Sequence, residues 1–230
     1  LKFTFVTLFP NLIEPYLKDS ILNRAVESNL ISYEFYNPRD FTTNKHKKVD
    51  DAMVGGGAGM LLSCQPLFDC LDEIKRKDKD AYIIFPLAAA KPFRQNDAKR
   101  LAKKKNIVMV SGRYEGIDER VIEKYANEVF SIGEYILTGG ELPSLVMADA
   151  ISRNVQGVLG NEASLDVESY ENNLLEAPSF TKPENYENLF VVKEYLKGNH
   201  SRICDLKFQM SICRTKYYSP NKEKKKKTDI

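Results

Sequence analysis

The sequence predicts an α/β fold with a mainly parallel sheet and helices on both faces, followed by a small helical domain. Two short apolar runs, residues 82–85 (YIIF) and 107–110 (IVMV), have the pattern of strands that are buried on both faces. Segments with helical periodicity lie before the first run and after the second, and such strand–helix alternation is typical of a parallel sheet. Eleven of the 12 glycines lie between Gly55 and Gly160, which indicates that the chain changes character after that point.

Two further strands are predicted near the start of the chain, over residues 3–9 (FTFVTLF) and 31–36. A helix is predicted over residues 66–77, because Leu67, Leu71 and Ile74 recur on one helical face. A second helical face follows the last strand and consists of Ile117, Val121, Ile122 and Tyr125.

A third helix is expected to begin near Leu142 and Pro143, since proline suits the first turn of a helix, and to end before Gly157. Its apolar positions are Leu145, Val146, Ala150 and Ile151. We expect a domain over residues 1–160, a polar linker over 161–173 and a basic helical domain over 174–230. That last domain looks helical from Ser179 onward, with Gly198 capping one helix. The apolar stripe of another helix is expected to comprise Ile203, Leu206, Met210 and Cys213.

Composition limits the class of protein. The chain has 230 residues, of which 43% are hydrophobic, and this supports a substantial core. It contains no run of eighteen apolar residues, so we expect no membrane partner and a cytoplasmic protein. The four cysteines form no CxxC pair, which argues against zinc and against a disulfide framework and favours reduced thiols.

Positive charge is concentrated at the end of the chain. From Lys182 onward there are 12 Lys and Arg against 6 Asp and Glu, whereas residues 1–181 carry 22 basic and 26 acidic side chains. The run over residues 222–227 is nearly pure lysine. A basic region attached to a mildly acidic body favours a polyanionic partner, although the lysine run could equally be a solubilising tail.

Two segments about twenty residues apart are the best candidates for a ligand site. They are residues 111–121 (SGRYEGIDERV) and 132–143 (IGEYILTGGELP), and each places glycines and polar residues after an apolar stretch. Ligands of open α/β sheets bind at the carboxyl ends of the strands. The glycines allow close backbone approach while Ile136 and Leu137 offer apolar contact, which suits a flat heteroaromatic group rather than a triphosphate.

Two other patterns have ordinary interpretations. The run Gly55-Gly56-Gly57-Ala58-Gly59 lacks the Lys-Ser/Thr ending of a phosphate loop, so a flexible or tightly turned loop with positive φ is expected there. Asp149 and Arg153 have the i, i+4 spacing of a surface ion pair.

Taken together, these segments resemble the bacterial tRNA (guanine-N1)-methyltransferases, a family of the SPOUT class. The matching stretches occur in family order and cover most of the chain: NPRDF (37–41), HKKVDD (46–51), GGGAGM (55–60), GRYEGIDERV (112–121), SIGEYILTGGELP (131–143), GVLGNEAS (157–164) and GNH (198–200). The resemblance implies a trefoil knot in the C-terminal part of the α/β domain. It also implies a homodimer with active sites shared between subunits, and a C-terminal domain that grips the anticodon branch of tRNA.

The resemblance further implies that the knot loops hold S-adenosylmethionine and that activity depends on Mg²⁺, with unknown ligands. By motif match the cofactor-binding residues are Pro86, Leu87, Ala88, Gly112, Tyr114, Ile132, Gly133, Glu134, Tyr135, Ile136, Leu137, Gly139 and Gly140. Relatives often carry Ser-Pro-Gln-Gly where this chain has Leu87-Ala88-Ala89-Ala90, so side-chain contacts in that loop differ.

The implied reaction methylates N1 of the guanosine immediately 3′ of the anticodon, and this chemistry needs a base for the N1 proton and a donor for O6. The family's catalytic aspartate precedes a Ser-aromatic pair in the linker, and here Glu168 precedes Ser169-Tyr170. Glu168 is therefore the expected base, with Asp166 as its rival. Arg153 matches the catalytic arginine, and Glu115 matches an acidic residue near the methionine part of the cofactor. The alternatives are a knotted methyltransferase acting on another RNA and a non-catalytic RNA-binding protein.

Overall fold

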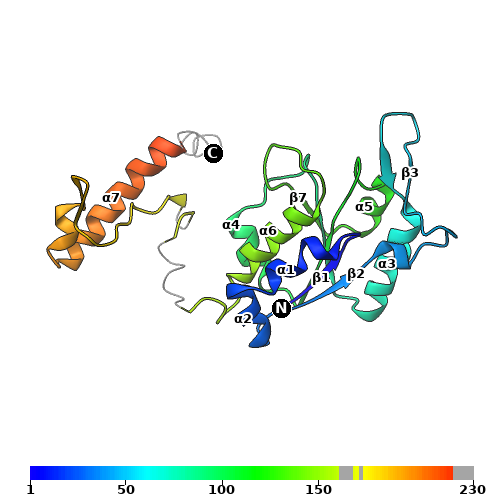
Figure 1. The fold of residues 1–230 in the computed structure, drawn as a ribbon, viewed down its shortest axis with the longest axis horizontal. Helices are drawn as coiled ribbons and strands as arrows, with labels where there is room; N and C mark the ends of the chain where they lie inside the picture. The colour runs from blue at the N-terminus through cyan, green and yellow to red at the C-terminus, as the bar shows by residue number, and fades with distance from the viewer. Residues whose placement is uncertain (161–167, 171–172, 220–230) are drawn as a thin grey trace, which may run out of the picture. The chain divides into compact units, whose positions relative to one another are not determined.

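The computed structural model describes residues 1–160, 168–170 and 173–219 (Figure 1). The chain divides into two compact units, Leu1–Gly160 and Asn161–Ile230. In the described part of the chain, no helix combines the length and the apolar character that crossing a membrane requires.

The first unit is built on a parallel sheet in the strand order β2-β1-β6-β5-β7. Its strands are β1 (Lys2–Val6), β2 (Ser32–Tyr36), β5 (Tyr82–Pro86), β6 (Asn106–Val110) and β7 (Glu128–Phe130). All five residues of β6 are buried, as expected for a central strand of a parallel sheet. The predicted α/β class, the parallel sheet and four of these strands are therefore confirmed.

Helices cover both faces of this sheet (Figure 1). Successive side chains of a strand point to opposite faces, so Ile107 and Met109 pack on one side and Val108 and Val110 on the other. The first side is covered by α1 (Glu14–Leu17), α2 (Ser20–Glu27), α4 (Gln95–Leu101) and α6 (Glu141–Ser152). The second is covered by α3 (Cys64–Lys77) and α5 (Glu119–Tyr125).

The first predicted strand is shorter than expected. It ends at Val6, because the Thr7 hydroxyl then accepts a hydrogen bond from the Phe9 amide and η1 (Pro10–Leu12) begins. A second 3-10 turn, η2 (Pro38–Asp40), follows β2.

The glycine run belongs to a hairpin between β3 (Asp50–Ala52) and β4 (Met60–Leu62). Gly55, Gly56, Gly57 and Gly59 all have positive φ, between 86° and 128°. Residues with a Cβ rarely adopt this conformation, so the expected tight turn is confirmed.

The second unit contains β8 (Asn185–Tyr186), β9 (Leu189–Phe190), η5 (Lys193–Leu196) and α7 (His200–Tyr218). The prediction that the chain is helical from Ser179 was wrong for residues 180–192. Glu187 and Asn188 have φ of 50° and 65°, the left-handed pair that a two-residue hairpin turn requires. The helix with the long periodic stripe begins only at His200, after Asn199, whose side chain accepts from the Arg202 amide.

The apolar stripe of α7 also differs from the prediction at one position. Ile203, Leu206 and Met210 are half-buried, but Cys213 is exposed and Thr215 is buried instead. Ser211 is half-buried and Thr215 lies four residues after it, so beyond Met210 the stripe continues on the side of Ser211 and Thr215 rather than at Cys213. The Thr215 hydroxyl accepts from the Leu175 amide and donates to the Ser211 carbonyl.

Candidate functional site

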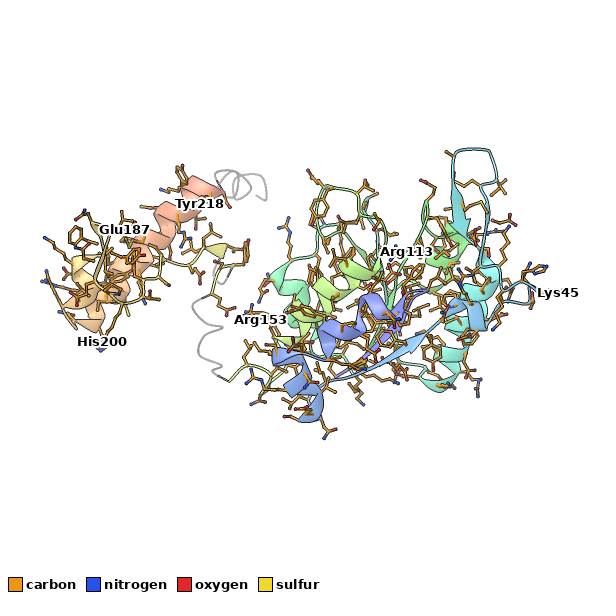
Figure 2. All side chains as sticks on the ribbon, in the orientation of Figure 1. Lys45, Arg113, Arg153, Glu187, His200 and Tyr218 are labelled. Carbon is orange, nitrogen blue, oxygen red and sulfur yellow. The ribbon has the colours of Figure 1, made fainter. Side chains whose placement is uncertain are left out.

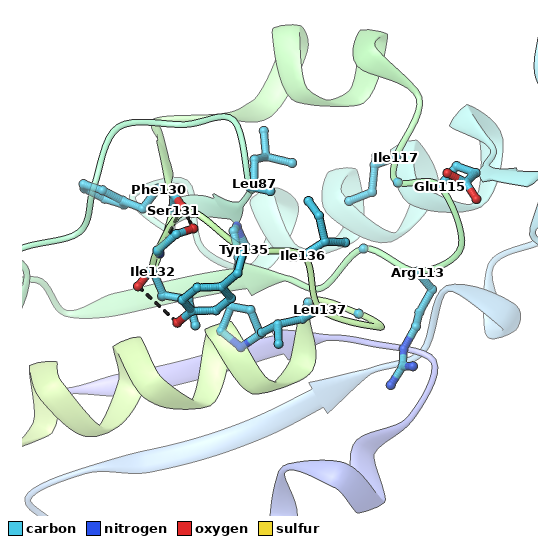
Figure 3. Close-up of a pocket in the computed structure, with 18 of the residues that line it drawn as sticks. Leu87, Arg113, Glu115, Ile117, Phe130, Ser131, Ile132, Tyr135, Ile136 and Leu137 are labelled. Atoms are coloured by element: carbon cyan, nitrogen blue, oxygen red, sulfur yellow. Dashed lines mark hydrogen bonds between the residues drawn. The ribbon is translucent and has the colours of Figure 1, made fainter.

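A cavity of about 410 Å³ lies at the carboxyl ends of β5, β6 and β7 (Figure 3). These strands are neighbours in the sheet, so the segments that follow them meet at one edge. The lining residues come from all three segments: Pro86, Leu87, Ala88, Gly112, Arg113, Tyr114, Glu115, Gly116, Ile117, Phe130, Ser131, Ile132, Gly133, Tyr135, Ile136, Leu137, Gly139, Gly140 and Pro143.

Most residues that motif matching assigned to the cofactor lie in this lining. The exception is Glu134, which is exposed and lies outside the lining. Glu115 lies within it. Sequence reasoning did not assign Phe130, Ser131 and Pro143, which also line the cavity. The signal for the first two was their place at the end of β7, where Phe130 is the last residue and Ser131 follows, but the sequence pattern did not reveal this strand.

The first wall of the cavity is the loop after β6, which is anchored at several points. The Glu115 amide donates to the Met60 carbonyl at 3.0 Å, and the Leu62 amide donates to the Gly116 carbonyl at 3.0 Å. These bonds join the loop to the glycine-rich hairpin. Tyr114 has a φ of 60°, which is uncommon for a residue with a side chain and indicates local strain.

Arg113 ties this loop to the start of α6. Its Nε lies 2.8 Å from Oε2 of Glu141, whose side chain is only 2% exposed. The Thr7 hydroxyl donates to the other Glu141 oxygen at 2.8 Å, and the Arg113 guanidinium lies 4.6 Å from the centre of the Phe9 ring. Because removal of one partner leaves a buried charge uncompensated, at a cost of roughly 3–5 kcal/mol, this network fixes the position of the loop.

The second wall is the loop after β7. Its ends are bonded to other segments, because the Ser131 amide donates to the Lys91 carbonyl at 2.8 Å and Arg113 Nη1 donates to the Thr138 carbonyl at 3.3 Å. The hydrogen bonds of its middle part, residues 132–137, are local. The Ser131 hydroxyl donates to the Gly133 carbonyl at 2.8 Å, and the Tyr135 hydroxyl donates to the Ile132 carbonyl at 3.3 Å (Figure 3). Tyr135 and Ile136 are 55% and 83% exposed. A cavity wall with such exposed apolar side chains has surface available for a ligand or a partner.

The two loops meet at Gly140. Its amide donates to the Gly112 carbonyl at 2.8 Å. A Cβ at Gly140 would lie 2.7 Å from the Gly112 nitrogen and 2.8 Å from the Ser111 Cα, which are backbone atoms that cannot rotate away. The sequence analysis attributed this glycine to the close approach of a ligand. The packing of the two loops alone already requires a residue without a side chain at this position.

Arg153 lies outside the cavity lining of its own chain. It follows α6 as the C-cap residue, whereas Gly140 precedes the same helix. A helix of 12 residues is about 18 Å long, so these two positions are far apart, as Figure 2 shows for Arg153 and Arg113. Asp149, its predicted ion-pair partner, accepts a hydrogen bond from the Tyr16 hydroxyl, which raises the pKa of Tyr16.

Glu168 belongs to the second unit and is half-buried. It begins a short turn in which the Tyr170 amide donates to the Leu174 carbonyl at 2.7 Å, and the Glu176 amide donates to Ser169 Oγ at 3.1 Å. Asp166, the rival base, lies outside the described residues.

A family model described as tRNA (Guanine-1)-methyltransferase TrmD matches residues 1–225. The chain belongs to this family. The resemblance drawn from its motifs and the prediction of an enzyme are thereby confirmed. The family match covers the cavity loops, Arg153 and Glu168 in one continuous alignment.

Three relatives named tRNA (guanine-N(1)-)-methyltransferase illustrate the likeness. The one from Sulfurimonas denitrificans is 64% identical, with 100% of each chain covered. The one from Sulfurovum sp. is 63% identical over 98% of this chain and 100% of its own. The one from Campylobacter curvus is 59% identical over 100% of this chain and 98% of its own.

The cavity fits the methyl donor that the methyltransferase family implies. Its volume is within the range of about 300–1,000 Å³ that is usual for small-molecule sites, and apolar walls with backbone groups suit a nucleoside. A metal site is a different matter. Among residues 1–160, 168–170 and 173–219 there is no group of three or more His, Cys, Asp or Glu side chains that could hold an ion, so no step is assigned to Mg²⁺.

Proposed function

We propose that this protein transfers a methyl group from S-adenosylmethionine to N1 of the guanosine immediately 3′ of the anticodon in tRNA. The observation that carries the proposal is the cavity at the ends of β5, β6 and β7, which the family motifs line from three separate segments. Because the proposed substrate is tRNA, we propose that the protein acts in the cytoplasm.

The proposed cofactor site uses both walls of the cavity. Leu87, Ile136 and Leu137 supply apolar contacts for an adenine ring, and the Glu115 carboxylate supplies negative charge. When bound, S-adenosylmethionine supplies an electrophilic methyl group on a positively charged sulfur. Glu115 lies against Gly59, where a Cβ would approach its Oε1 to 2.7 Å, so the glycine hairpin leaves room for this carboxylate.

The proposed chemistry on guanine is a proton removal coupled to methyl transfer. N1 of guanine carries a proton at neutral pH, and Glu168 accepts it as general base. Negative charge then develops on O6, and the guanidinium of Arg153 stabilises it by donating hydrogen bonds. A glutamate reaches further than the family's aspartate, and hydrogen bonds hold the two residues that follow Glu168, Ser169 and Tyr170.

A homodimer is proposed because the cavity and Arg153 lie at opposite ends of α6 in one chain. A second copy can bring its own Arg153 and Glu168 to the cavity of the first. The outer side of α6 supports this arrangement, since Leu142 and Val146 are 55% and 43% exposed and lie one turn apart.

The decisive experiment compares two tRNAs that differ only in having guanosine or adenosine immediately 3′ of the anticodon. We expect labelled methyl groups only on the first, at N1 in base-resolved mapping. Equal labelling of both would favour a methyltransferase acting on another RNA site. If calorimetry detected no binding of S-adenosylmethionine, a non-catalytic RNA-binding protein would be the better description.

The base is tested by comparing Glu168→Gln with Asp166→Asn. We expect Glu168→Gln to lower kcat by about 100-fold or more, since general-base catalysis is worth roughly 10²–10⁴ in rate. Its affinity for S-adenosylmethionine should stay within error of the unaltered protein. A larger loss in Asp166→Asn would transfer the assignment to Asp166.

A further inference from the structure

A strongly basic strip lies within the first unit, away from the basic C-terminal region. Residues 91–105 hold seven Lys and Arg and one Asp, a net charge of +6. The rest of Leu1–Gly160 carries 15 basic and 20 acidic residues, a net charge of −5. The net charge of the strip is therefore opposite in sign to that of the rest of the unit. Neither the cavity nor the catalytic residues account for this charge.

The strip is the outer surface of α4 and of the segments on either side of it. Ala98 and Leu101 of α4 are buried in the core, so its opposite side faces outward. Lys91, Arg94, Arg100, Lys103 and Lys105 are exposed. The strip begins shortly after the cavity residues Pro86, Leu87 and Ala88 and ends just before Asn106, the first residue of β6.

Only part of this charge is neutralised by the ion pairs of the strip. Glu128 pairs with Lys91 at 2.7 Å and with Arg100 at 2.8 Å, and Asp97 also pairs with Arg100. Within the described part of the chain, these two carboxylates pair with Lys91 and Arg100 and not with Arg94, Lys103 or Lys105. Lys104 Nζ lies 4.0 Å from the centre of the Tyr82 ring, a contact that leaves its charge in place.

Helix electrostatics explain some of these cations but not all of them. Lys99 and Arg100 lie in the last turn of α4, where positive charge favours the helix dipole. Arg94 is the N-cap residue, where positive charge is unfavourable for the same dipole. Lys103 and Lys105 follow the helix. The helix dipole therefore does not explain the positive charge of Arg94.

The strip shares one end of the unit with Arg153. α4 leads from β5 back to the start of the parallel strand β6, so it runs antiparallel to the sheet. α6 packs beside α4 (Figure 1) and begins at the cavity edge. Its C-cap residue Arg153 therefore lies toward the same end of the sheet as Lys103 and Lys105, which precede the start of β6. A polyanion that approached Arg153 would pass close to this part of the strip.

We propose that residues 91–105 form a second tRNA-binding surface, which contacts backbone phosphates through Arg94, Lys103 and Lys105. The choice of tRNA as the occupant rests on the proposed function, and the choice of phosphate rests on the charge of the strip. Such contacts add affinity without sequence preference and position the substrate. They would hold tRNA on the α/β unit independently of the C-terminal region.

The test is the triple variant Arg94→Gln, Lys103→Gln, Lys105→Gln in the full chain. The matched control is Arg76→Gln, Lys79→Gln, Lys124→Gln, which removes the same charge from exposed positions on the α3 and α5 side. Filter binding of unmodified tRNA is measured across a salt series for both. For the strip variant we expect a Kd about 10-fold higher and a log–log salt slope smaller by about 2–3, since each phosphate contact contributes nearly one unit.

The Kd of the control variant for tRNA should stay within about 2-fold of that of the unaltered protein, because salt screens surface charges that lie far from the bound tRNA. Unchanged binding of S-adenosylmethionine by calorimetry shows that the variant is folded. Equal tRNA affinity and equal salt slopes in the two triple variants would overturn the proposal. Failure of the unaltered protein to methylate tRNA would instead contradict the proposed function, whereas the binding comparison would still decide whether the strip contacts tRNA.

Discussion

The two walls of the cavity are held in different ways. The loop after β6 is bonded to the hairpin of β3 and β4 and to α6, through backbone hydrogen bonds and the pair between Arg113 and Glu141. The loop after β7 is bonded to other segments at its two ends, through Ser131, Thr138 and Gly140, but the hydrogen bonds of residues 132–137 are local, and Tyr135 and Ile136 are exposed. One wall is therefore set by folding, while the other has the exposed apolar surface of a segment that a ligand can order.

We infer from this difference that the anchored wall contributes mainly to the stability of the fold, whereas the exposed wall contributes mainly to ligand binding. Substitutions in the anchored wall should change the free energy of unfolding, and binding would change as a consequence. Substitutions in the exposed wall should change ligand affinity with little effect on unfolding. The contact between Gly140 and Gly112, where the walls meet, should be the most sensitive position.

The largest effect is expected for Gly140→Ala. The new Cβ would lie 2.7 Å from the Gly112 nitrogen, so the two backbones must separate and the hydrogen bond between them is strained. We expect the free energy of unfolding to fall by about 3 kcal/mol, the upper end for overpacking, as measured by urea denaturation.

Gly160→Ala is the matched control for this substitution. No heavy atom lies within 4 Å of a Cβ placed at Gly160. Its stability should therefore stay within about 0.5 kcal/mol of the unaltered protein. Similar unfolding midpoints for the two variants would mean that the loops do not depend on their close contact.

An intermediate, pH-dependent effect is expected at Glu128, which anchors β7 ahead of the exposed wall. Burial opposes ionisation there, but hydrogen bonds from Arg100, Lys91 and Tyr82 outweigh it and lower the pKa of Glu128 to about 2. A lowered folded-state pKa means that this stabilisation is complete above the unfolded carboxyl pKa of 4.5. It is lost as the pH falls from there through about 2.

The measurement compares unfolding of the unaltered protein and Glu128→Gln between about pH 7 and pH 3. The stability difference should be largest near neutral pH and shrink as acid is added. Glu123→Gln, at an exposed position of α5, serves as the control. A stability difference for Glu128→Gln that does not vary with pH would show that the cluster contributes nothing through charge.

The sequence predicted the parts of the fold that local pattern determines. The strands β5 and β6 are continuous apolar runs because both faces are covered, and α3 has a clear apolar stripe. β7 escaped prediction because it has only three residues and begins with Glu128. α4 escaped because five of its seven residues are polar or charged and only Ala98 and Leu101 are buried.

The sequence predicted which segments form the site but not the contacts between their side chains. Loops that follow parallel strands meet at one edge, so motif spacing was enough to bring most of the lining together. Motif spacing does not determine the direction in which one side chain of a loop points, so it could not predict that Glu134 is exposed. The pair between Arg113 and Glu141 joins residues 28 positions apart in different motifs, and only the folded backbone brings them together.

The smallest effect on stability is expected for Ile136→Ala, in the exposed wall. Ile136 is 83% exposed, so truncation should change the free energy of unfolding by less than about 0.5 kcal/mol. If S-adenosylmethionine buries this side chain, the loss of apolar contact should raise its Kd by about 5- to 10-fold, equivalent to about 1 kcal/mol. Leu189→Ala, which truncates a similarly exposed side chain of the second unit, should leave that Kd unchanged. Hydrogen exchange sharpens the result, because added cofactor should slow exchange in the loop after β7 more than in the loop after β6. Equal protection of the two loops would mean that both walls are set by folding alone.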